Sequence, residues 1–262
     1  MIDNVKEYVT RFATFDEPVP YKSLLIYPVL VRDFFSFATC FDVIQIDKDS
    51  IPDPDIISMS YLKFLIEIVF KNDTKIGDTN YTIGQINSDK FVLLMKLCFH
   101  LSDDDEIIIL QENNKYYLQI KDEKIKAKEF DEIIKIIMFQ NVYDYFDDYI
   151  DPDFKKAVDE YYAVKNKGLI NPDLEAKMTA VTVMTGMKKH DFFDMTYREF
   201  ENVFHSALSK MDYEIAKSAE MSGMVKFDKP VDHWVYQRKK NRYEDAFTSY
   251  DGLKEKISQV NG

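Results

Sequence analysis

Apolar residues recur at three- and four-residue spacing over most of this chain, which is the pattern of helices that bury one face. In the first hundred residues this spacing predicts three helices, over residues 31–41, 54–69 and 89–100. Asp53, which a proline follows, is placed to cap the second helix, and Ser88 is placed to cap the third. The N-terminal half is therefore expected to be largely helical.

Two stretches depart from the helical spacing. Residues 17–29 hold prolines that disfavour helix, so they are expected to be extended. Residues 107–110 and 116–120 are rich in isoleucine and tyrosine and flank a polar turn, which predicts a β-hairpin, and residues 124–127 are expected to add a short third strand. Helical spacing returns at residue 130.

The C-terminal half again has a helical pattern. Asp151 and Asn171 each precede a proline, a combination that is typical of helix starts, and the first of these helices is expected to end near Gly168. Thr196 and Glu199 have the spacing of a capping box at the start of a long helix. One face of that helix carries an apolar stripe, formed by Phe200, Phe204, Leu208, Met211 and Ile215.

These elements predict a mainly α protein of the α+β kind. We expect an N-terminal α+β region with a small β-hairpin module over residues 1–145, a C-terminal helical bundle over 146–224, and a basic, aromatic, extended arm over 225–262. Only seven glycines and eight prolines occur in 262 residues, which favours helices over a turn-rich sandwich.

Charge and composition exclude several classes of protein. A hydrophobic fraction of 46% excludes an intrinsically disordered chain. No apolar run approaches the ~18 residues of a membrane span, and the N-terminus lacks a signal-peptide core, so we expect neither a membrane partner nor secretion.

The net charge of −12 disfavours nucleic acid as a partner. The charge divides into −14 before residue 225 and +2 after it, which predicts protein–protein contact, either with the protein's own body or with a second copy.

Candidate chemistry is sparse. The histidines lack the paired spacing of a helical metal site: His100, His190, His205 and His233. The acidic clusters at 103–106 and 144–153 do not follow the calcium-loop pattern, and Cys40 and Cys98 lie in apolar runs as expected of buried thiols. No nucleophile elbow or glycine-rich phosphate loop occurs. We therefore predict a non-enzymatic protein without catalytic residues, metal or cofactor; an enzyme that uses the 144–153 carboxylates is the least favoured alternative.

Methionines and aromatic residues supply the candidate partner-binding positions. Seven of the eleven methionines fall between residues 178 and 224; most are expected in the core, although flexible thioethers also form adaptable binding surfaces. The arm adds the only tryptophan and a basic run. The candidate residues are Met184, Met187, Phe192, Phe193, Met221, Met224, Trp234, Tyr236 and Arg238. Phe204 is expected either in the bundle core or in a partner groove.

Three segments resemble proteins of bacteriophage tails. Residues 18–37 (PVPYKSLLIYPVLVRDFFSF) and 51–65 (IPDPDIISMSYLKFL) resemble proteins encoded in the tail modules of phages that infect low-GC Gram-positive bacteria. Residues 186–200 (GMKKHDFFDMTYREF) are similar to a segment of phage tail-assembly chaperones, and the N-terminal half also resembles baseplate-hub assembly proteins.

This resemblance implies a non-enzymatic assembly chaperone that binds phage tail or baseplate proteins in the cytoplasm of the infected host. The alternative that it leaves open is a structural component retained in the virion tail or baseplate. Self-association through the arm is compatible with either role.

Overall fold

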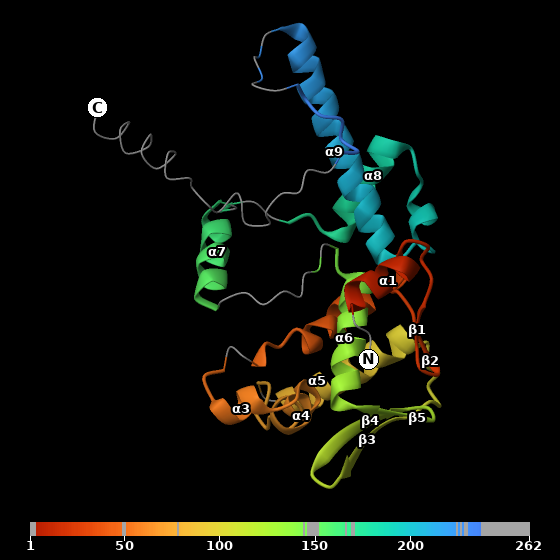
Figure 1. The fold of residues 1–262 in the computed structure, drawn as a ribbon, viewed down its shortest axis with the longest axis vertical. Helices are drawn as coiled ribbons and strands as arrows, with labels where there is room; N and C mark the ends of the chain where they lie inside the picture. Colours follow the sequence, from red (N-terminus) through yellow and green to blue (C-terminus); the bar gives the residue numbers. More distant parts are fainter. Residues whose placement is uncertain are drawn as a thin grey trace, which may run out of the picture. The chain divides into compact units, whose positions relative to one another are not determined.

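The structure, a computed structural model, is mainly helical and carries two small antiparallel sheets within the part of the chain that it describes (Figure 1). The described residues are 4–48, 51–77, 79–143, 145, 152–165, 167–168, 171–223, 225, 227 and 230–236. The predicted fold class, mainly α with a small β-hairpin module and a helical C-terminal region, is confirmed.

The chain forms two compact units, and each contains two separate stretches of sequence. Unit 1 consists of Met1–Asp147 and Met178–His205, and unit 2 consists of Asp148–Lys177 and Ser206–Gly262. The predicted boundary at residue 145 lies close to the first of these breaks. The predicted 146–224 domain differs from the observed division, because residues 178–205 belong with the N-terminal region.

Backbone hydrogen bonds join this returning stretch to the rest of unit 1. The N–H of Val31 donates to the carbonyl of Met195 over 2.9 Å, and the N–H of Tyr197 donates to the carbonyl of Val29 over 2.8 Å. The two bonds form a short antiparallel bridge. Local periodicity cannot reveal a pairing between segments so distant in sequence, which explains why the predicted division separated them.

Unit 1 begins with helix α1 (Val5–Ala13) and a small hairpin. Strands β1 (Val19–Tyr21) and β2 (Leu24–Ile26) pair antiparallel, and Lys22 in the turn between them has a φ of 53°. The extended conformation predicted for residues 17–29 is thus present, and its first part is a paired hairpin.

The predicted helix over residues 31–41 is divided. A 3-10 turn, η1 (Val31–Asp33), leads into α2 (Phe34–Cys40), and a second 3-10 turn, η2 (Phe41–Ile44), follows it. The apolar spacing located the helix correctly but did not indicate its tightened ends.

The predicted helix over residues 54–69 is broken in the middle. Asp53 caps α3 (Pro54–Ser58) as predicted, accepting the N–H of Asp55 over 2.9 Å. Ser60 then caps a new helix, α4 (Tyr61–Phe64), which continues as the π-helical turn η4 (Leu65–Val69). The break follows from Ser60, whose hydroxyl accepts the N–H of Lys63 over 3.3 Å and so starts a separate helix.

Helix α5 (Ile83–Phe99) starts earlier than predicted. Its N-cap is Thr82, which forms a capping box with Gln85. The Gln85 N–H donates to the Thr82 hydroxyl over 3.2 Å, and the Thr82 N–H donates to Oε1 of Gln85 over 3.0 Å. Ser88, the predicted cap, lies inside the helix. A reciprocal box satisfies two N-terminal N–H groups where a lone serine satisfies one, and this favours the earlier start.

The β-hairpin module agrees with the prediction. Strands β3 (Ile107–Glu112), β4 (Lys115–Ile120) and β5 (Glu123–Lys126) form an antiparallel sheet in that order. Asn113 and Asn114 both have positive φ, as a two-residue hairpin turn requires. Helix α6 (Ala127–Asn141) follows directly.

The later helices are α7 (Pro152–Lys165), α8 (Leu174–Thr185), the 3-10 turn η5 (Lys189–Phe192) and α9 (Tyr197–Ser222). Asp173 accepts the N–H of Ala176 over 2.8 Å, so it caps α8 in place of the predicted Asn171. Asp151, the predicted cap of α7, lies outside the described residues.

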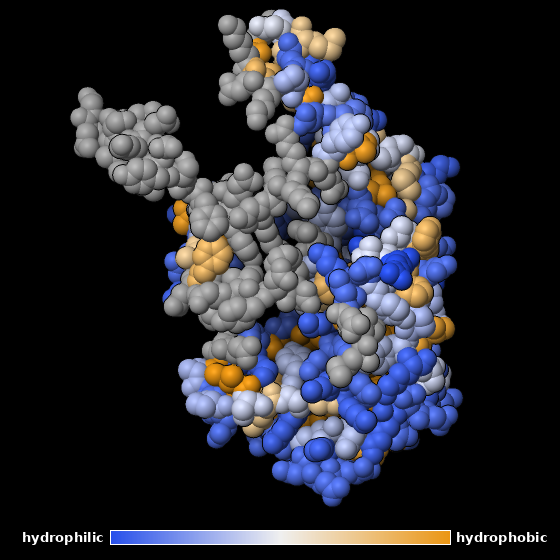
Figure 2. All heavy atoms as spheres, in the orientation of Figure 1, coloured by the Kyte–Doolittle hydropathy of each residue, from blue (hydrophilic) through white to orange (hydrophobic). Residues whose placement is uncertain are grey.

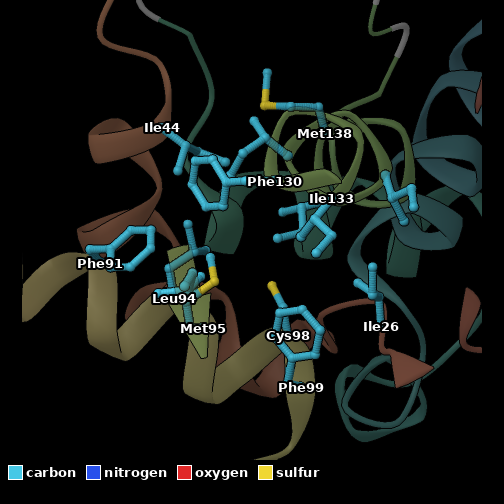
Figure 3. Packing of buried hydrophobic residues seen from close by; sticks show 14 of the residues in the cluster. Ile26, Ile44, Phe91, Leu94, Met95, Cys98, Phe99, Phe130, Ile133 and Met138 are labelled. Carbon is cyan, nitrogen blue, oxygen red and sulfur yellow. The ribbon is translucent and has the colours of Figure 1, made fainter. Parts of the chain in front are cut away.

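The core of unit 1 lies around α5 and α6. Phe91, Leu94 and Met95 of α5 lie near Phe130 and Ile133 of α6, and all five side chains are buried (Figure 3). The rings of Phe91 and Phe130 are 5.9 Å apart. Helices α1 and α4 pack against α6, and α2 packs against α5. This core holds the elements of unit 1 that line the pocket described below.

Candidate partner-binding surface

The apolar stripe of α9 is buried at one end and exposed at the other. Phe200 and Phe204 are 0% and 7% exposed, and Leu208 is half-buried. Met211 and Ile215, farther along the same face, are 42% and 64% exposed. We call Leu208, Met211 and Ile215 the distal face of α9. Figure 2 shows apolar residues among hydrophilic ones in the region where Figure 1 draws α9.

The chain that follows α9 contacts the opposite side of the helix. The Val231 N–H donates to Oε1 of Glu220 over 3.0 Å, and the ring of His233 lies 5.0 Å from that of Tyr213. At about 100° per residue, Tyr213 and Glu220 point away from Ile215. The described residues of the arm therefore pack on the polar side of α9 and leave the distal face uncovered.

An ion pair supports this attachment. The Lys217 ammonium hydrogen-bonds to Oε2 of Glu220 over 2.5 Å, and the other carboxylate oxygen receives the Val231 N–H. The Lys217 hydrogen bond and, after it, the Val231 N–H lower the pKa of Glu220 below its ordinary value. The arm is thus bound by a carboxylate whose charged form the folded protein favours.

The predicted partner-binding residues fall in different environments. In unit 1, Met184 and Met187 are half-buried and Phe193 is 48% exposed. In unit 2, Trp234 is half-buried, whereas Met221 and Tyr236 are 80% and 76% exposed. Met224 and Arg238 lie outside the described residues.

Phe192 does not have the exposure that a partner-binding residue needs. It is 0% exposed, and its ring packs edge-on against Phe200 at 5.4 Å. The residue ends the 3-10 turn η5 and packs against a ring near the start of α9, so its role in this structure is core packing.

The cysteines are unsuited to nucleophilic chemistry. Cys40 and Cys98 are buried and free, as predicted. Burial raises the pKa of Cys40 to about 11, and it raises the pKa of Cys98 as well. A thiol with a raised pKa carries little of the nucleophilic thiolate at neutral pH.

The histidines lie beside aromatic rings or carboxylates. His100 stacks on Tyr27 at 3.7 Å, and His205 stacks on Tyr143 at 4.2 Å. His190 lies 2.9 Å from Asp191. Within the described ranges, no group of three or more His, Cys, Asp or Glu side chains is arranged to hold a metal ion.

The carboxylates of the acidic cluster at 103–106 bind groups in or near the turn that contains them. Asp105 accepts the N–H of Ser102 over 2.7 Å, and Asp103 accepts the Lys96 ammonium over 2.9 Å. The aspartates of the 144–153 cluster have no described side chains. Of the described helices, none has the length and apolar character to cross a membrane.

Comparisons of the chain with protein-family models, with curated proteins and with solved structures found no match.

Proposed function

We propose that this chain is a non-enzymatic assembly protein that binds a tail or baseplate protein of a bacteriophage. Its support is the resemblance of residues 18–37, 51–65 and 186–200 to phage tail-module proteins, together with the exposed distal face of α9. The exposure of Ile215, 64% on a face that is buried nearer the helix start, is the observation that carries the proposal.

Helix α9 continues its apolar pattern beyond Phe204, the last buried position of the stripe. A large aliphatic side chain gains about 1.5–3 kcal/mol when it is fully buried, so exposed side chains at regular spacing leave free energy for a partner to gain. Amphipathic helices commonly bind partners through positions such as i, i+3 and i+7, which is the spacing of Leu208, Met211 and Ile215. Met211 adds a flexible side chain that adapts to the partner's shape.

The proposal is tested by capture of tail proteins from infected cells on tagged protein. Ile215→Glu should abolish capture of a phage tail or baseplate protein, because it places a charge in the interface. Val183→Glu is the matched control, since Val183 is an exposed side chain (79%) of α8 and lies outside the distal face. Equal capture by both variants, or capture of no tail protein by the unmodified chain, would contradict the proposal.

Mass spectrometry of purified virions separates the chaperone from the structural alternative. A chaperone that binds transiently should be absent from the particle, whereas a structural component should be present in stoichiometric amounts. Deletion of residues 225–262 adds a second readout: normal particles would exclude a role for the arm in joining subunits.

A further inference from the structure

A cavity of about 930 Å³ lies in unit 1, far in sequence from α9. Its walls come from α1, the β1–β2 turn, the start of α4, the start of β4, and the end of β5 with the first turns of α6. Volumes of this order are typical of sites that enclose a ligand. This cavity, which we call the Lys–Tyr pocket, is unrelated to the partner-binding residues predicted from sequence.

The Lys–Tyr pocket is positively charged in a protein whose net charge is −12. Five lysines line it, against the two glutamates Glu129 and Glu132, which gives the lining a net charge of +3. The lysines are Lys22, Lys63, Lys115, Lys126 and Lys128. A local charge that opposes the sign of the whole molecule selects anionic ligands.

Two of these lysines are engaged within the protein. The Lys22 ammonium lies 2.8 Å from Glu129 and 3.2 Å from Glu123, and the hydrogen bond to Glu129 is the largest of the effects that raise the pKa of Lys22. Lys63 lies 3.7 Å from Glu67. These ion pairs join neighbouring parts of the pocket wall, and they leave the two ammonium groups little charge with which to attract a ligand.

The other three lysines are exposed and form no ion pair with any described residue: Lys115, Lys126 and Lys128. Lys126 is the cross-strand neighbour of Tyr117, and Lys115 lies two residues before Tyr117 on β4, so both lie on the same face of the sheet as that ring. Lys128 follows in the first turn of α6. Lys115 and Lys126 thus lie at the rim of the pocket on the Tyr117 face of the sheet, where the Lys124 ammonium is 4.1 Å from the centre of the Tyr117 ring, whereas Tyr116 faces the other side.

Three of the four tyrosines of the pocket are held in place by their hydroxyl groups. Tyr8 donates to the carbonyl of Pro20 over 2.8 Å, Tyr21 donates to Glu132 over 2.7 Å, and Tyr116 donates to Glu67 over 2.8 Å. Because these hydroxyls already have partners, the surfaces that the rings offer to a ligand are mainly apolar. A ligand should therefore combine negative charge with aromatic or aliphatic groups.

A carboxylate-bearing peptide fits this arrangement better than a compact phosphate. Phosphate groups are commonly held by arginine forks, by free N–H groups at a helix start, or by lysines that converge on one point. The described lining contains no arginine, and the Lys126 N–H at the start of α6 already donates to Glu129 over 2.8 Å. The three available lysines belong to β4, β5 and α6, and such separated charges match carboxylates spread along a chain.

We propose that the Lys–Tyr pocket binds an acidic protein segment in which carboxylates alternate with aromatic side chains. The lysines pair with the carboxylates at the rim, and the tyrosine rings pack against the aromatic side chains. This site is independent of the distal face of α9, so either proposal can fail without the other.

Calorimetry on the full chain tests the proposal with a synthetic peptide in which aspartate alternates with tyrosine. We expect saturable binding that weakens as NaCl is raised from about 50 mM to about 200 mM, because rim ion pairs are screened. A peptide that alternates aspartate with serine should bind much more weakly, and one that alternates lysine with tyrosine should not bind.

Charge-reversal variants locate the site. Lys115→Glu and Lys128→Glu should each weaken binding at least about fivefold. Lys121→Glu is the matched control, because Lys121 is an exposed lysine in the turn just after the opposite end of β4. Melting curves show whether each variant remains folded.

Three results would overturn the proposal: no binding of the aspartate–tyrosine peptide, equal binding of the aspartate–serine peptide, or unchanged binding by Lys115→Glu and Lys128→Glu. Binding of ATP or inorganic phosphate that these variants abolish, without peptide binding, would identify a phosphate site instead.

Discussion

The side-chain hydroxyl of Thr196 donates a 2.6 Å hydrogen bond to Oδ1 of Asp16, which lies 180 residues earlier in the chain. The same hydroxyl accepts the N–H of Glu199 over 3.1 Å and so caps α9. One side chain thus both starts the longest described helix and attaches it to the N-terminal region.

Thr196→Ala should therefore destabilise unit 1 by more than a simple cap would. Loss of a cap costs about 0.5–2 kcal/mol, and loss of a hydrogen bond to a carboxylate adds about 1.5–3 kcal/mol. The free energy of unfolding, measured in urea, gives the sum of these two losses. Thr196→Ser retains both bonds and is the control; equal destabilisation by serine and alanine would assign the effect to packing of the methyl group instead.

Phe204→Ala should lower the free energy of unfolding by about 3–5 kcal/mol, because the ring is 7% exposed and its removal leaves a cavity. Ile215→Ala, on the same stripe but exposed, should change it by less than about 0.5 kcal/mol. Melting curves, measured together with partner capture, distinguish a residue of the core from a residue of the interface. A Phe204→Ala variant that keeps its stability but loses its partner would place Phe204 in a groove.

Acid should release the arm from α9. The pKa of Glu220 is lowered in the folded protein, so its contribution is fully present above the unfolded value of 4.5 and is lost as the pH falls through the lower folded value. Fluorescence of Trp234, the only tryptophan, should report the release. Glu220→Gln should lack this acid transition; an identical transition in that variant would show that another group controls it.

The two thiols should resist labelling in the folded protein. Because burial raises the pKa of Cys40 to about 11 and also raises that of Cys98, neither should react with Ellman's reagent at pH ~8 while the denatured chain reacts fully. Rapid reaction of the native protein would mean that the region around α2 or α5 opens readily.

Elements with a strong local signal were predictable from the sequence. The three-stranded module, the Asp53 cap and the stripe that begins at Phe200 all rest on neighbouring residues, and the structure contains them. The start of α5 is also encoded locally, in the Thr82–Gln85 pair, whereas the prediction placed the cap at Ser88.

Features that depend on distant residues were not predictable. The attachment of Thr196 to Asp16 joins segments that share no periodicity. The Lys–Tyr pocket takes its lining from separate elements, and no two of its available lysines form a recognisable motif. Phe192 is of a residue type that is common at interfaces, and its burial becomes evident only from its contact with Phe200.

The order in which the chain builds its two units has a consequence for synthesis on the ribosome. The hydrophobic core cluster of unit 1 is drawn from residues between Val9 and Phe139, so all its side chains have been translated before Met178–His205 is made. N-terminal domains generally fold first during synthesis, and here the core can form while the stretch that completes the unit is still to come. Met178–His205 is then added through its backbone hydrogen bonds to Val29 and Val31, and residue 205 marks the earliest point at which unit 1 has all its parts.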